Sequence, residues 1–247
     1  MPRRTAGRCE RAVESGCSNS TDAARSIAFV DIGARRTRLV SMNADGSGRS
    51  LVLIRGDIEH PTWSPDGARI AFDSFLPRRG FIAIFVVNVD GSGLKRLSPR
   101  HSLDESPDWS PDGTLIAFDS QKTGKIMTMD PAGGNRTVVA GNHAFGPSWS
   151  PDGSKIVFVA YPVTGRTEIF VVNADGSGRT RLTRSPRRWE FTPAFSPDGT
   201  KIVFCRTTSR RGTSPEDLWV MSADGSSPVK ITHTALRDEF APSWQAL

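Results

Sequence analysis

A five-residue motif, Trp-Ser-Pro-Asp-Gly, recurs along this chain of 247 residues. It begins at Trp63, Trp109 and Trp149, and it returns at Phe195 with Phe in place of Trp. A second motif, Asn-Ala-Asp-Gly-Ser-Gly or a variant of it, alternates with the first. Self-similarity at a period of a few tens of residues is the signature of a repeat architecture. The chain is therefore expected to build one supersecondary unit several times over.

Each unit is predicted to contain four short strands, which we call A, B, C and D. The clearest unit has them at residues 61–63, 69–72, 84–87 and 94–97. Ser-Pro-Asp-Gly supplies a type I turn between A and B, because Pro presets φ and Gly closes the turn. The Asp-Gly-Ser-Gly stretch supplies the turn between C and D, with Gly where left-handed backbone is needed.

Repeated antiparallel units of this size predict an all-β fold, a β-propeller of four-stranded blades. We expect five blades. The first unit has no strand A of its own, so we expect the C-terminal strand at 242–244 to close the first blade and remove its open edge. We divide the chain into a basic, disordered N-terminal tail at 1–25 and a propeller at 26–247.

Strand A is predicted to be the innermost strand of each blade. A proline precedes the aromatic residue by two positions in every copy, and proline is tolerated where one side of a strand makes no ladder bonds. The aromatic residue itself is expected to be a wedge between neighbouring blades, a structural role.

At this point the residues resemble a family. Pro-x-Trp-Ser-Pro-Asp-Gly, then Ile-Ala-Phe, then Asn-x-Asp-Gly-Ser-Gly, is similar to the WD-like propeller repeat of the TolB type, from Ser26 to Trp244. The resemblance implies a binding platform without catalytic activity and a periplasmic location. The chain departs from that family twice, because it has no room for an α/β domain before the propeller and shows five repeats where six are usual.

The strand order sorts the connections between two ends of the propeller. The A–B and C–D turns, which hardly vary, share one end, the turn face; the variable D–A and B–C loops share the other, the loop face. Variable loops on a rigid scaffold are where function is usually found. The D–A loops are expected to form an acidic channel mouth: Glu59, His60, Asp104, Glu105, His143, Glu190, Asp238 and Glu239. The B–C loops are expected to form a basic rim further out: Arg35, Arg36, Arg78, Arg79, Arg210 and Arg211.

We predict that this face binds a protein or peptide; the structural alternative is that the acids hold loop amides and the bases are solvated. The second functional hypothesis is a carbohydrate-active enzyme, a glycosidase or a polyuronate lyase, which uses acidic and histidine residues at the channel mouth. No Gly-x-Ser-x-Gly elbow or phosphate-binding loop is present. We expect no cofactor, and we assign no metal site because no histidine shows tight ligand spacing.

Composition excludes further classes. No apolar run approaches the roughly 18 residues that cross a bilayer. The first 25 residues are polar and lack an apolar core, so we expect no secretory signal peptide, and a cytoplasmic location stays open beside the periplasmic one.

The formal charge of +6 is a weak hint of anionic partners. A nucleic-acid role is not expected, since no aromatic stacking surface accompanies the arginines. We expect a monomer.

Overall fold

The computed structural model describes most of the chain. The described residues are 12–14, 26–32, 37–43, 45–55, 57–76, 80–141, 143–162, 165–185, 187–208 and 217–232. The secondary-structure elements of these residues are all β-strands, and among them there is no helix that could span a membrane.

The strands form five four-stranded antiparallel sheets, as predicted, and each sheet is one blade. The first contains β1 (Ala12–Glu14), β2 (Ser26–Ile32), β3 (Thr37–Asn43) and β4 (Ser50–Arg55). The second contains β5 (Ile58–Trp63), β6 (Arg69–Leu76), β7 (Phe81–Asn88) and β8 (Lys95–Arg96). The third contains β9 (Asp104–Trp109), β10 (Ile116–Ser120), β11 (Lys125–Met129) and β12 (Thr137–Ala140). The fourth contains β13 (Ala144–Trp149), β14 (Lys155–Ala160), β15 (Glu168–Asn173) and β16 (Thr180–Arg181). The fifth contains β17 (Trp189–Phe195), β18 (Lys201–Thr207), β19 (Asp217–Ser222) and β20 (Val229–Lys230).

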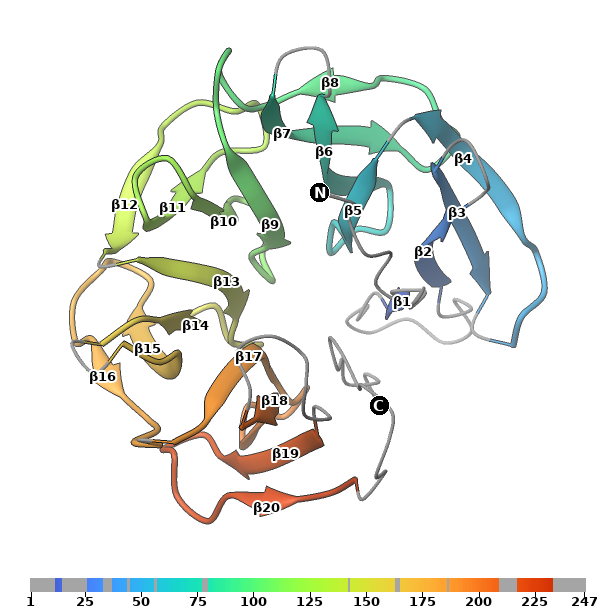
Figure 1. Ribbon diagram of the computed structural model, residues 1–247. Coiled ribbons are helices and arrows are strands. Elements are labelled where there is room, and N and C mark those ends of the chain that lie inside the picture. The colour runs from blue at the N-terminus through green and yellow to red at the C-terminus, as the bar shows by residue number, and fades with distance from the viewer. Residues whose placement is uncertain are drawn as a thin grey trace, which may run out of the picture.

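The blades are arranged around a common axis as a β-propeller (Figure 1). Strands β5, β9, β13 and β17 lie nearest the axis, while β8, β12, β16 and β20 lie on the outside (Figure 1). Strand order follows chain order in every sheet, so the predicted A, B, C and D strands are confirmed. Because neighbouring strands are antiparallel, the D–A and B–C loops meet at the loop face.

A β-bulge interrupts strand A in blades two to five, next to its proline. The residue before the proline has a left-handed backbone each time: His60 (φ 47), Ser106 (φ 52), Gly146 (φ 60) and Thr192 (φ 47). A bulge bends the strand and re-aims the groups beside it. It therefore turns this backbone amide away from the ladder of its own sheet.

The A–B turns are built alike in blades two to five. In the second blade the Ser64 hydroxyl donates to Asp66 Oδ1 at 2.5 Å, and Asp66 Oδ1 also accepts from the Ala68 amide at 3.0 Å. Serine and aspartate at the corresponding positions repeat these bonds in the later blades. Such side-chain bonds hold the turn backbone in place. The repeated motif is therefore accounted for by turn geometry.

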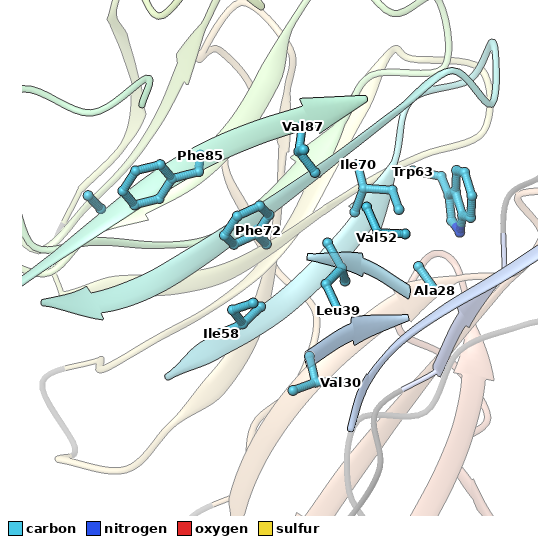
Figure 2. Packing of buried hydrophobic residues seen from close by; sticks show 11 residues of the cluster. Ala28, Val30, Leu39, Val52, Ile58, Trp63, Ile70, Phe72, Phe85 and Val87 are labelled. Carbon is cyan, nitrogen blue, oxygen red and sulfur yellow. The ribbon is translucent and has the colours of Figure 1, made fainter. Parts of the chain in front are cut away.

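The core lies between blades. Figure 2 shows Trp63 of the second blade beside Ala28, Leu39 and Val52 of the first. Trp109 likewise packs on Ala71 of the blade before it, and Trp149 on Ala117. The interpretation of the aromatic residue as an interblade wedge is confirmed for these three positions, whereas Trp244 lies outside the described residues.

The first blade corrects one prediction. Its inner position is taken by β1, which pairs with β2 through Ala12–Phe29, Val13–Ala28 and Glu14–Ile27. The strand at 242–244, which we expected there, lies outside the described residues. The edge of β2 can accept any extended segment, so sequence symmetry alone did not decide which end of the chain would pair with it. Residues 12–14 thus form the inner strand of the first blade.

Candidate functional site

Four carboxylates and one histidine gather on the loop face of the second and third blades. Glu59 and His60 lie on β5 and Glu105 on β9, while Asp73 and Asp119 lie on the neighbouring strands β6 and β10. We call these five residues the inner acidic cluster.

The cluster is built from two like-charged cross-strand pairs. Glu59 lies directly opposite Asp73 in the second blade, and Glu105 lies directly opposite Asp119 in the third. The same positions in the fourth and fifth blades are Phe145–Val159 and Phe191–Cys205. Like charges opposite one another destabilise a sheet, whereas aromatic–aliphatic pairs stabilise it. The fold itself therefore does not require these carboxylates, and both pairs occur in adjacent blades.

The bulges connect neighbouring blades through hydrogen bonds. The Ser106 amide of the third blade donates to Asp73 Oδ1 at 3.2 Å, and the Gly146 amide of the fourth donates to Asp119 Oδ1 at 3.2 Å. Nδ1 of His60 lies 2.7 Å from the same Asp73 Oδ1. The left-handed backbone at the bulge thus places amide hydrogens and an imidazole on aspartates that would otherwise lack partners.

Burial and mutual repulsion make two carboxyl groups of the cluster, those of Glu105 and Asp119, hard to ionise. Burial raises the pKa of Glu105 to about 7, with the charge of Asp73 adding to the effect and His60 and the Gln121 amide opposing it. The pKa of Asp119 is also raised to about 7: burial is the main cause and the charge of Glu105 adds to it, while the Gly146 amide opposes both. Carboxyl groups with such pKa values are typical of functional sites.

Little positive charge offsets the cluster. Among the residues that the structure describes, none of its four carboxylates forms an ion pair with lysine or arginine. The group that opposes this negative charge is the imidazole of His60, which is positively charged only when it is protonated. The arrangement can therefore accept a cation, either a lysine or arginine side chain or a metal ion. One atom each of Glu59, His60 and Asp73 that could ligate a metal lies within 4.8 Å of the other two.

The other predicted channel-mouth residues lie elsewhere. Asp104 is buried and paired with Arg136 Nη2 at 2.9 Å. Glu190 is fully buried, paired with Arg206 Nη2 at 2.6 Å and hydrogen-bonded to Thr183. His143 is exposed on the loop face beside Gly124 and is not part of the cluster. Asp104 and Glu190 thus each pair with an arginine of their own blade.

Eight predicted residues lie outside the described part of the chain. They are the channel-mouth residues Asp238 and Glu239 and the whole basic rim, Arg35, Arg36, Arg78, Arg79, Arg210 and Arg211.

Sequence reasoning missed Asp73 and Asp119, because attention was on the loops and these residues lie within strand B. A signal was available. Strand B reads Ile-Ala-Phe-Asp-Ser in the second and third blades, but Ile-Val-Phe-Val-Ala and Ile-Val-Phe-Cys-Arg in the fourth and fifth. A carboxylate in a buried strand position that other repeats fill with an apolar residue is a departure from the needs of the fold.

Comparison with known proteins agrees with the fold. The family model of the TolB beta propeller domain matches residues 16–142 and 125–246. The chain belongs to this TolB β-propeller family. Over 76 residues it is 42% identical to the Tol-Pal system protein TolB of Syntrophus aciditrophicus (strain SB). That match spans 29% of the chain and only 16% of the relative's length.

Solved structures show the same propeller. The putative TolB of Agrobacterium tumefaciens has a TM-score of 0.67 at 24% identity, over 82% of this chain and 76% of that one. TolB of Acinetobacter baumannii has a TM-score of 0.70 at 22% identity, over 86% of this chain and 53% of that one. Oligogalacturonate lyase of Vibrio parahaemolyticus has a TM-score of 0.59 at 13% identity, over 82% of this chain and 61% of that one. At these identities the structural likeness shows the fold alone, and it is shared by TolB proteins and a lyase.

Proposed function

We propose that this TolB-type propeller is a non-catalytic binding module that takes a protein or peptide on its loop face, with a basic side chain entering the inner acidic cluster. The observation that carries the proposal is the pair of like-charged cross-strand contacts, Glu59–Asp73 and Glu105–Asp119, where other blades have apolar pairs. A lysine or arginine placed between them would relieve their repulsion and would be bound by several carboxylates at once. We further propose that the protein is a periplasmic monomer; the family supports the location.

The proposal is tested by selecting short random peptides displayed on phage against the wild-type protein, then measuring the affinity of selected peptides by calorimetry in the presence of EDTA. The test variant carries four substitutions of the cluster: Glu59→Gln, Asp73→Asn, Glu105→Gln and Asp119→Asn. We expect enrichment of lysine or arginine in the selected peptides. The variant should bind them at least tenfold more weakly, a change of about 1.4 kcal/mol.

A charge-matched control separates the site from net charge. Asp45, Asp90, Asp175 and Asp224 lie in exposed C–D turns on the turn face, and each accepts a backbone amide bond from the residue two positions on. Asparagine can accept the same bond, so replacing all four with Asn removes as many charges without removing the turns. Equal loss of affinity in both variants would refute the proposal, as would selected peptides without basic residues.

A second candidate function is carbohydrate chemistry. Its supporting observation is that Glu105 and Asp119, which lie opposite one another, both have a pKa raised to about 7. A carboxyl group that stays protonated near neutral pH can act as a general acid, as in glycosidases. Incubation with a panel of glycans and polyuronates tests it: product formation by the wild type that Glu105→Gln abolishes would favour this candidate over a binding module.

A further inference from the structure

We propose that Glu59, His60 and Asp73 form a binding site for a divalent transition-metal ion of the zinc class. Glu59 and His60 are consecutive on β5, and Asp73 faces Glu59 across the strand pair. One candidate ligand atom of each residue lies within 4.8 Å of the other two. The site uses part of the inner acidic cluster but needs no peptide, so it can be tested independently of the proposed function.

The contact between His60 and Asp73 brings two possible ligand atoms together. Nδ1 of His60 lies 2.7 Å from Asp73 Oδ1, and in the neutral ring that is protonated on Nε2 the lone pair on Nδ1 faces this carboxylate. An ion that binds Nδ1 can therefore be bound by Asp73 as well.

Two buried carboxylates have an oxygen without a hydrogen bond. The Asp73 side chain is 4% exposed, and its hydrogen bonds from the Ser106 amide and His60 both involve Oδ1. Asp119 is 2% exposed, and its hydrogen bond from the Gly146 amide also goes to Oδ1. Among the described residues no donor is bonded to Oδ2 of either aspartate. These oxygens are therefore available to a cation.

The ligand types select the class of ion. An imidazole nitrogen together with carboxylate oxygens suits zinc and its neighbours better than Mg²⁺ or Ca²⁺, which prefer oxygen ligands alone. Zn–N and Zn–O bonds are about 2.1 Å long, so two ligands of a tetrahedral ion lie about 3.4 Å apart. The atoms of the site must therefore approach by up to about 1.4 Å. Glu59 is exposed, so its side chain can move to close this distance.

The test uses the full-length, untagged protein, dialysed against EDTA and then against metal-free buffer, with no peptide present. Zn²⁺ and Ca²⁺ are titrated separately by calorimetry, and Co²⁺ is titrated while its visible absorption is recorded. Each titration is repeated with His60→Ala, with Asp73→Asn, and with His143→Ala, which removes an exposed histidine of the same face that is not part of the cluster. Circular dichroism in EDTA checks that each variant is folded.

We expect the wild type and His143→Ala to bind one Zn²⁺ per chain more tightly than Ca²⁺, and Co²⁺ to develop the absorption of a nitrogen- and oxygen-ligated ion. His60→Ala should lose that absorption, and Asp73→Asn should weaken Zn²⁺ binding by about 10- to 100-fold. Absence of stoichiometric Zn²⁺ binding by the wild type, or wild-type affinity in a folded His60→Ala, would overturn the proposal. Peptide binding measured in EDTA is unaffected by either result, so failure here does not imply failure of the proposed function.

Discussion

Asp108 joins the inner strands of three blades, and its ionisation should make stability depend on pH. It lies on β9 of the third blade; Oδ2 accepts from the Trp149 amide of the fourth blade at 2.8 Å, and Oδ1 accepts from the Thr62 hydroxyl of the second at 3.4 Å. Burial nevertheless raises the pKa of Asp108 from 3.8 to about 6, against the opposing effect of these bonds. The folded protein therefore holds this proton more tightly than the unfolded chain does.

The sign and size of the pH effect on the free energy of unfolding follow from proton binding at Asp108 in the folded and unfolded states. Between pH 4 and pH 6 the folded state binds more protons at Asp108 than the unfolded state, so the free energy of unfolding falls as pH rises through this window. The stabilising contribution is complete below the unfolded pKa of 3.8 and is lost above the folded value of about 6. One pKa unit corresponds to about 1.4 kcal/mol, and partial access of solvent lowers the effect, so we expect a loss of about 1 to 3 kcal/mol.

Asp108→Asn isolates this effect, because asparagine cannot ionise but can still accept the Trp149 amide bond. Urea unfolding followed by tryptophan fluorescence at pH 4, 5, 6 and 7 gives the free energy of unfolding of both proteins. The wild type should lose about 1 to 3 kcal/mol relative to Asp108→Asn between pH 4 and pH 7. Asp112→Asn is the control: hydrogen bonding to Ser110 lowers the pKa of Asp112, so its contribution changes only below about pH 4. The free energy of unfolding of the wild type minus that of Asp108→Asn should fall as pH rises. A value of this difference that stays constant or increases with pH would refute the reasoning.

Two further predictions concern the contacts between strands and blades. Gly91→Ala should destabilise the protein more than Gly46→Ala in thermal unfolding: both glycines have φ near +84°, but a Cβ on Gly91 would meet the Val52 carbonyl oxygen of the first blade at 2.5 Å, whereas Gly46 has no atom within 4 Å. Equal losses would mean that backbone strain alone, about 1 kcal/mol, decides both. Glu190→Gln should cost about 3 to 5 kcal/mol in urea unfolding, because it leaves Arg206 buried without its carboxylate. The double variant Glu190→Gln with Arg206→Met should recover part of that loss, and failure to do so would contradict the role of an unpaired charge.

The repeats made most of the fold predictable. Turn motifs, strand periodicity and the aromatic wedges of Trp63, Trp109 and Trp149 are local features that each blade needs, so the sequence states them several times. The closing strand of the first blade occurs once, and either end of the chain could supply it. Repetition therefore predicted the blades but not their closure.

The site was predictable only in part. Glu59, His60 and Glu105 could be placed on the loop face from strand direction alone. Whether an acid there faces a ligand or an internal arginine depends on partners distant in sequence, such as Arg136 for Asp104 and Arg206 for Glu190. No spacing along the chain reports such pairs. Asp73 and Asp119 break the apolar pattern of strand B in the sequence, and the cross-strand register places them opposite Glu59 and Glu105.

Our central proposal is that a ligand binds at the inner acidic cluster. The most direct test is a crystal structure of the protein with a peptide selected on it. We predict a lysine or arginine of the peptide within about 4 Å of carboxylate oxygens of the cluster, the range of an ion pair. A peptide bound to the turn face or to the outer strands, with the cluster uncontacted, would contradict it.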